Sequence, residues 1–187
     1  MKSVRINRSG RCEMGFETKG GLPNAVRRAL LTDVSSFAPT EVLIRRNTSC
    51  QSDEYIAHRV GLIPFVQGGT SCTSLSLSVS GRTATTSDLR GDSFRAVHEI
   101  PLVRLNDTQT LDLDVRFGRG TAAEHAKFAQ IGPVSYTRGD KERTAMGFET
   151  INNTCALDYL EAALQTLVAS VDDAKLQVET TETETTL

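Results

Sequence analysis

The residues best suited to chemistry are Asp53, Glu54, His58 and Arg59, which lie within two turns of a predicted helix. Glu54 and His58 are four residues apart, and side chains at this spacing face the same side of a helix. Such a pair could bind a metal ion or share a proton in acid–base catalysis. No third ligand follows nearby, and charge pairing along a helix is the commoner reason for this spacing.

Other candidates for metal binding are weaker. His125, beside Glu124 and Lys127, is as ambiguous as His58, and a structural role is again preferred. The four cysteines form no CxxC or CxC pair: Cys12, Cys50, Cys72 and Cys155. Structural zinc sites usually contain such pairs, so the sequence predicts no metal and reduced, mostly buried thiols.

Motifs for catalysis are missing from the sequence. It contains no P-loop, GxGxxG, HExxH or nucleophile elbow, and the short GRG at 118–120 cannot cradle a phosphate. The residues therefore predict no catalytic group of the chain's own.

An arginine pair offers a different kind of chemistry. Arg27 and Arg28 lie on a predicted helix, about 100° apart around its axis, so both can flank one apolar stripe. Two interpretations stay open, namely a solvated helix face and bidentate contacts across a protein interface. Asn24, just before them, is predicted to hydrogen-bond the backbone at the start of the helix.

The elements that position these residues follow from periodicity. Alternating residues over 4–16 predict a β-hairpin with a turn at Ser9-Gly10. The stripe Leu22, Val26, Leu30 and Val34 predicts a helix, which Pro39 cannot continue. A strand is predicted over 41–46, and Ser52 or Asp53 should cap a second helix whose buried face carries Ile56 and Val60.

The middle and the end of the chain differ in composition. Residues 66–99 are rich in Ser, Thr and Gly and predict exposed strand and loop with little core, whereas 111–117 alternate as a half-buried strand. Thr121 and Glu124 form a capping-box pattern for a short helix that ends at Phe128.

A strand over 145–151 precedes a last helix over about 154–171. The helix has coiled-coil spacing, with Leu157, Leu160, Leu164, Leu167 and Val171 in its seam.

These elements predict an α+β fold with a two-layer domain interrupted by a β-rich insert domain. The first domain is discontinuous and comprises 1–48 plus 134–178, the insert is 49–133, and 179–187 form a disordered acidic tail. The apolar seams are larger than so thin a domain can cover, which indicates an interface.

Composition limits the partners. The 187 residues carry a formal net charge of -2, so bulk charge does not favour direct binding to DNA, which would be contacted only through partners. No secretory segment or membrane-spanning run occurs, so the sequence predicts a soluble intracellular protein with no membrane contact.

Three blocks of sequence carry a family resemblance. The first runs from LPNAVRRALLTDV through EVLIRRNTS to DEYIAHRVGLIPF, the second is IPLVRLNDTQTLDLDVRFGRGTAAEHAKFAQI, and the third is GFETINNTCALDYLEAALQTLV. In this order they resemble the shared core of RNA polymerase assembly subunits, namely bacterial alpha, its archaeal D-type counterpart and the third-largest subunit of eukaryotic RNA polymerase II.

The resemblance implies a non-catalytic assembly subunit of a multisubunit DNA-dependent RNA polymerase. It would form a heterodimer with a small alpha-like (L-type) subunit, and the pair would dock the second-largest and largest subunits, with small accessory subunits added later. The resemblance implies that the discontinuous two-layer domain is the dimerisation domain. The implied dimer interface comprises Leu22, Val26, Leu30, Leu157, Leu160, Leu164 and Leu167. The residues implied to dock the large subunits are Asn24, Arg27, Arg28, Glu54, His58, Arg59, His125 and Lys127.

Departures from the family pattern sharpen these expectations. Many members have a cysteine-rich zinc loop or an iron–sulfur module in the insert, but residues 66–99 contain only Cys72, so no cofactor is expected here. A bacterial C-terminal DNA-binding domain is missing, which is compatible with an archaeal or virus-encoded polymerase. The expected location is the nucleus or cytoplasm, according to the host, or a virion.

Two other classes remain open. One is an independent homodimeric scaffold protein with the same fold, and the other is a metal- or histidine-dependent enzyme.

Overall fold

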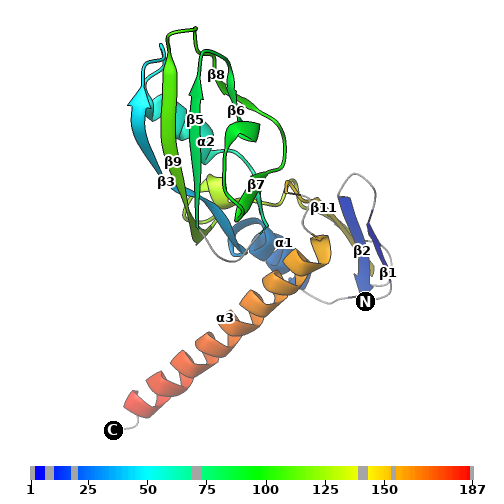
Figure 1. Ribbon diagram of the computed structural model, residues 1–187. Coiled ribbons are helices and arrows are strands. Elements are labelled where there is room, and N and C mark those ends of the chain that lie inside the picture. The colour runs from blue at the N-terminus through cyan, green and yellow to red at the C-terminus, as the bar shows by residue number, and fades with distance from the viewer. Residues whose placement is uncertain are drawn as a thin grey trace. The chain divides into compact units, whose positions relative to one another are not determined.

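The computed structural model describes residues 3–6, 11–17, 21–68, 73–138, 143–152 and 155–185. The chain divides into two compact units. A discontinuous unit combines Met1–Val34 with Ile131–Leu187, and a continuous unit comprises Ser35–Gln130. Both are built from antiparallel strands and helices, so the predicted α+β class is confirmed (Figure 1).

The discontinuous unit contains a four-stranded antiparallel sheet of order β1-β2-β11-β10. Its strands are β1 (Ser3–Ile6), β2 (Arg11–Glu17), β10 (Ser135–Arg138) and β11 (Arg143–Glu149). β1 and β2 form the predicted hairpin, whose turn at Ser9-Gly10 lies outside the described residues. β2 pairs with β11 through Met14 and Met146, so the two separate stretches of chain form one sheet.

Two helices pack together in the discontinuous unit, α1 (Leu22–Thr32) and α3 (Ala156–Thr185). α1 ends two residues before the predicted Val34, where the N–H of Asp33 bonds to the Ala29 carbonyl. The core they share with the strands contains Val26, Ala29, Leu30, Val34, Ile131, Val134, Met146, Phe148, Ala156, Tyr159, Leu160 and Ala163.

α3 is longer than its apolar seam. The sequence predicted an end near Val171 and a disordered tail over 179–187, but the helix continues to Thr185. Residues 172–179 include Ala, Lys, Leu, Gln and Glu, which favour helix, so the local sequence supports a helix beyond Val171. No helix in the described part of the chain is long and apolar enough to span a membrane.

The continuous unit contains a three-stranded antiparallel sheet of order β3-β9-β5. Its strands are β3 (Ser35–Asn47), β9 (Thr110–Thr121) and β5 (Ser74–Ser80). The alternation predicted for residues 111–117 is confirmed, because the apolar residues of this stretch are buried and the charged ones between them are half-buried or exposed. β3 begins well before the predicted residue 41, and a register shift after Pro39 lets this edge strand accommodate a proline.

Smaller elements complete the continuous unit. They are α2 (Asp53–Gly61), β4 (Phe65–Gln67), β6 (Ala84–Thr85), η1 (Thr86–Asp88), β7 (Phe94–Ala96), β8 (Pro101–Val103) and η2 (Ala126–Phe128). β4 pairs with β7, and β6 pairs with β8. α2 lies against one face of the three-stranded sheet (Figure 1), and its Ile56 and Val60 belong to the same buried core as the apolar residues of β5 and β9.

The prediction that residues 66–99 contain little core is wrong. Leu75, Leu77 and Val79 of β5 are buried, since the serines between them occupy the outer face of the strand. Phe94 of β7 stacks on Phe117 of β9 with 3.9 Å between ring centroids. The serine-rich composition therefore led to a wrong prediction, because the segment contains a half-buried strand and an aromatic core residue.

β3 belongs to the continuous unit because it pairs along most of its length with β9. The sequence instead predicted that the discontinuous domain extends to residue 48, which would include residues 35–48 of this strand and its end.

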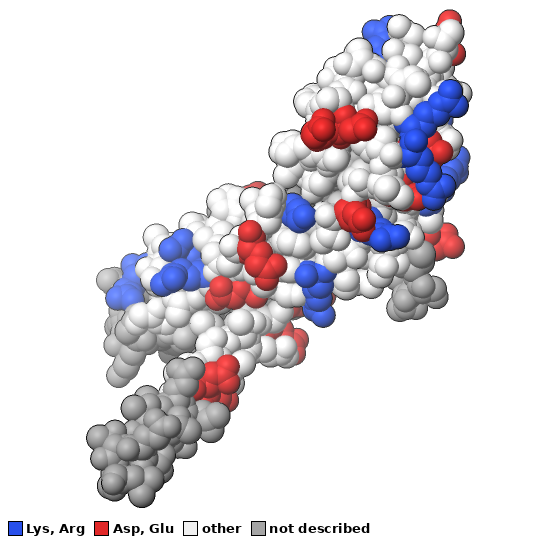
Figure 2. Space-filling model, turned by 90° about the vertical axis from the view of Figure 1, so that its left-hand side faces the viewer, with Lys and Arg blue, Asp and Glu red and all other residues white. Residues whose placement is uncertain are grey.

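The outer face of the three-stranded sheet is polar. Arg45 pairs with Asp114, and Arg116 Nη1 lies 3.0 Å from Glu41 Oε2. In Figure 2 charges of both signs are interspersed over the face shown of the continuous unit, in the upper part of the view. Leu43, between Glu41 and Arg45 on β3, is also 51% exposed on this face.

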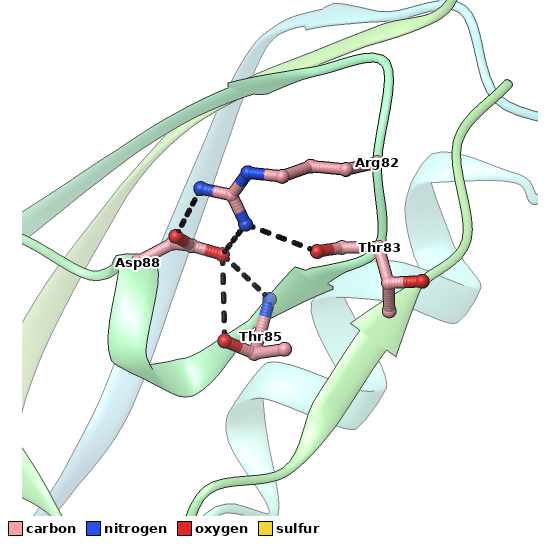
Figure 3. Close-up of polar contacts among 4 residues, drawn as sticks. All are labelled: Arg82, Thr83, Thr85 and Asp88. Atoms are coloured by element: carbon pink, nitrogen blue, oxygen red, sulfur yellow. Dashed lines mark hydrogen bonds and ion pairs between the residues drawn. The ribbon is translucent and has the colours of Figure 1, made fainter. Parts of the chain in front are cut away.

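An ion pair closes the turn before η1 (Figure 3). Arg82 Nη2 and Nη1 donate to the two carboxylate oxygens of Asp88 at 2.5 and 2.9 Å. The N–H of Thr85 donates to Asp88 Oδ2 at 2.9 Å, which completes a capping box. The hydrogen bond from Arg82, opposed by burial, lowers the pKa of Asp88 from its usual 3.8 to about 2.

Replacing Asp88 should make stability depend less on pH. Because the pKa of Asp88 is lower in the folded chain than in the unfolded chain, its carboxylate stabilises the fold at pH values above the unfolded pKa. This stabilisation is lost as the pH falls through the folded pKa, that is, between about pH 4 and pH 2. We expect Asp88→Asn to lower the free energy of unfolding by about 1–2 kcal/mol at pH 7, a difference that shrinks towards pH 2. Urea unfolding at both pH values measures this, with the exposed Asp107→Asn as control. Equal stability of wild type and Asp88→Asn at pH 7 would contradict the structural role.

Candidate protein-interaction surfaces

The described residues contain no group of three or more His, Cys, Asp or Glu side chains that could hold a metal ion. Cys50 and Cys155 are exposed free thiols, so the prediction of burial is wrong for these two. The side chain of Cys12 and all of Cys72 lie outside what the structure describes. The remaining candidates are surfaces that could contact another protein.

α2 presents Glu54 and His58 to solvent. Its start is capped by Ser52, whose Oγ accepts a hydrogen bond from the N–H of Tyr55 at 3.4 Å. Glu54 and His58 are both exposed, and no hydrogen bond or ion pair joins them. The spacing thus brings the two residues to one side of the helix without forming an acid–base pair.

Arg59 is tied to its own unit. Its Nη2 donates to the Pro101 carbonyl at 2.7 Å, and its Nη1 donates to the Tyr55 hydroxyl at 3.3 Å. The guanidinium carbon lies 5.8 Å from the centre of the Tyr55 ring. These contacts fix α2 to β8, so Arg59 holds the helix in place and its guanidinium is already bonded within its own unit.

Tyr55 and Leu62 extend the exposed side of α2. Both side chains are about half exposed, at 45% and 51%. Together with His58 they follow a spacing of three and four residues, which places all three on one helix face. Neither residue was predicted from sequence, although that spacing around His58 could have indicated them. Tyr55, His58 and Leu62 are called the α2 face below.

In α1, Asn24 and Arg27 are joined to each other. Asn24 Oδ1 accepts hydrogen bonds from Arg27 Nε at 3.3 Å and Nη2 at 3.2 Å. The helix N-cap is Gly21, which has no side-chain bond, so Asn24 does not cap the backbone as predicted. Arg28 is exposed, and its guanidinium makes no hydrogen bond or ion pair with the residues that the structure describes.

His125 has a local structural role. Its Nδ1 accepts a hydrogen bond from the N–H of Lys127 at 3.0 Å and so caps η2. Lys127 Nζ lies 5.3 Å from the centre of the Phe128 ring. The predicted helix opening at Thr121 is therefore wrong: the backbone turns there, and only a short 3₁₀ helix follows. The His125 side chain caps η2 in place of the predicted capping box of Thr121 and Glu124.

The eight predicted docking residues are divided between the units. Asn24, Arg27 and Arg28 lie in the discontinuous unit, and the other five lie in the continuous unit.

The seven predicted dimer residues fall into two groups. Val26, Leu30 and Leu160 are buried in the core of their own unit, and Leu167 packs partly against it. The three exposed ones are Leu22, Leu157 and Leu164. The buried residues hold the two helices together, and only the exposed ones can touch another chain directly.

α3 carries an exposed apolar stripe. The stripe comprises Leu157, Leu164, Val168 and Val171, with exposed fractions of 38%, 40%, 62% and 53%. Their spacing of seven, four and three residues aligns them along one side of the helix. Val168 was missed from sequence because the leucine spacing predicted a seam through Leu160 and Leu167, which α1 and the sheet partly or wholly cover. This set is called the α3 stripe below.

Comparison with known proteins decides the family. No protein-family model matches the chain. DNA-directed RNA polymerase subunit Rpo3 of Methanocaldococcus jannaschii is 30% identical over 190 aligned residues, which cover 97% of this chain and 98% of that protein. The chain belongs to the alpha-like family of RNA polymerase subunits.

Other members of the alpha-like family match a shorter part. Rpo3 of Thermococcus kodakarensis is 34% identical over 60% of this chain, and subunit RPAC1 of bovine RNA polymerases I and III is 27% identical over 62%. The chain matches about half the length of each of these two relatives, 49% and 47%. The resemblance that the three sequence blocks indicated is therefore confirmed, and the chain is an RNA polymerase subunit.

Proposed function

We propose that this alpha-like subunit assembles a polymerase and does not itself catalyse. It pairs through the discontinuous unit, its dimerisation domain, with a small alpha-like (L-type) subunit. The pair then docks the second-largest and largest subunits, and small accessory subunits join later. The observation that supports this most is the α3 stripe, four apolar side chains exposed in a row on one helix.

The free energy gained by burying apolar side chains favours a partner on the α3 stripe. Full burial of a valine or leucine side chain contributes roughly 1.5–3 kcal/mol. Contiguous apolar side chains on the surface commonly mark a protein contact. Leu22 of α1 is also exposed and belongs to the same unit. A helix from another chain could cover the α3 stripe and recover this free energy.

Docking of the large subunits is assigned to polar and aromatic residues. Arg28 in α1 is exposed and makes no hydrogen bond or ion pair with the described residues, so its five donors are available to a partner. On the continuous unit, which we propose as the insert domain, the α2 face combines an aromatic, a histidine and a leucine. Tyrosine and arginine are enriched at interface hot spots.

Catalysis and DNA contact are assigned to the partner subunits, and no metal or other cofactor is proposed for this chain. The net charge of -2 agrees with a protein that meets DNA only through its partners.

Purification of an affinity-tagged chain from cells that express it tests the proposal. We expect the largest and second-largest polymerase subunits to co-purify in amounts comparable with the tagged chain. The chain expressed and purified without its partners should contain less than stoichiometric zinc and iron. A tagged chain recovered alone or only with a second copy of itself would favour the homodimeric scaffold. Stoichiometric metal in the chain purified without partners would show that the proposal of no cofactor fails.

A further inference from the structure

The α3 stripe is bounded differently on its two sides. On one side lie Leu160 and Ala163, which the unit itself buries. On the other side lies Glu161, exposed and about 40° from Leu157 around the helix axis. Its carboxylate accepts a hydrogen bond from the neutral Gln165, at 3.3 Å, and forms no ion pair with the described residues. A helix that covers the stripe must therefore pass beside an unneutralised carboxylate.

The charges along α3 are mostly of one sign. Over residues 156–175 the acidic side chains are Asp158, Glu161, Asp172 and Asp173, and the basic one is Lys175. Lys175 Nζ already lies 3.8 Å from Asp172 Oδ1. Figure 2 shows acidic side chains where the described part of the helix meets the grey atoms of its end. Asp158, Glu161 and Asp172 lie on the free side of the stripe, about 100°, 40° and 60° from Leu157 around the helix axis, whereas Lys175 lies in line with the stripe and Asp173 on the opposite side. The free side of the stripe is therefore acidic.

A second copy of this chain fits such a surface poorly. In a parallel pair of α3 helices, the Glu161 side of one helix would face the Leu160 and Ala163 side of the other, which carries no basic residue between 156 and 175 to neutralise Glu161. In an antiparallel pair aligned over the stripe, Asp158 of one helix would lie near Asp172 of the other. Like charges at these positions oppose pairing, whereas opposite charges select the partner. Phosphate groups of nucleic acids and acidic lipids would be repelled in the same way.

We propose that the α3 stripe selects a partner helix with an apolar seam flanked by lysine or arginine, and that its acidic border disfavours self-association. The inference rests on the proposed function, since it names the chemistry of the helix that the polymerase partner would supply. A basic residue opposite Glu161 would neutralise the carboxylate while the four apolar side chains of the stripe become buried.

Two synthetic helical peptides test this with the full chain. Both have three heptads with leucine at the seam, and they differ only in lysine or glutamate at the flanking positions. We expect the lysine peptide to bind at least about tenfold more tightly at low salt, and the difference to shrink in high salt. Fluorescence anisotropy measures both dissociation constants.

Variants of the chain make the test specific. Glu161→Lys should remove or reverse the preference for the lysine peptide. Asp173→Lys should keep most of it, because this variant changes the net charge by the same amount at an exposed position on the opposite side of α3. Circular dichroism checks that both variants stay folded. Equal affinity of the unmodified chain for the two peptides, or no binding of either, would overturn the inference.

The two proposals fail separately. If polymerase subunits co-purify with the tagged chain but the peptides bind equally, only the charge selection is wrong. If the lysine peptide is preferred but no polymerase subunit co-purifies, the stripe selects a basic helix of some other protein, and the proposed function fails.

Discussion

Leu164→Asp is expected to weaken pairing with a co-expressed small alpha-like subunit strongly while leaving the chain folded. The side chain is 40% exposed at the middle of the α3 stripe, so aspartate costs little in the free chain. In the complex the same carboxylate would be buried against apolar groups without a partner, and losses of about 2 kcal/mol or more are typical of such central positions. The dissociation constant should therefore rise by about thirtyfold or more.

Pull-down of the co-expressed pair, followed by light scattering, measures this loss. Ala169→Asp is the matched control, because it adds the same charge to an exposed position of α3 away from the stripe. Thermal unfolding of both variants separates a binding defect from a folding defect. Normal pairing of Leu164→Asp would show that the partner does not cover the stripe.

Phe94→Ala should be among the most destabilising substitutions in the continuous unit. The ring is buried, stacks on Phe117 at 3.9 Å between centroids, and lies 5.6 Å from Phe37. Truncating a buried phenylalanine leaves a cavity as well as removing buried area, so we expect a loss of about 3–5 kcal/mol in the free energy of unfolding.

Urea denaturation checks this value, with Arg95→Ala as the control, because Arg95 is the exposed neighbour on the same strand. A loss below about 1 kcal/mol for Phe94→Ala would mean that residues 66–99 pack as loosely as their composition first indicated.

Local patterns predicted the elements that are half buried. The alternation in β9 and the Ser52 cap of α2 are properties of a few neighbouring residues, and both are confirmed. The hairpin of β1 and β2 also followed from alternation over a short stretch. In these cases the period of the apolar residues, or one capping side chain, was sufficient to predict the local structure.

Other features depend on contacts between residues far apart in the sequence and could not be predicted from local patterns. β3 begins at Ser35 because β9 supplies partners that lie far later in the sequence, with Ser35 opposite Thr121. The core role of Phe94 depends on Phe117 and Phe37, neither of which is near it in sequence. Capping of η2 by His125 replaced a capping box that looked equally suitable.

The candidate interaction surface was predicted only in part for the same reason. The sequence indicated that α3 has more apolar residues than one face needs. It could not show that α1 and the sheet cover Leu160, or that Val168 stays exposed. That division depends on how α3 is rotated against α1, which tertiary packing decides.

Native mass spectrometry of the complex purified with the tagged chain tests the central claim most directly. The account predicts an assembly that contains one copy of this chain, one small alpha-like subunit and the two largest polymerase subunits. A mass that corresponds to two copies of this chain, with no polymerase subunit bound, would contradict it.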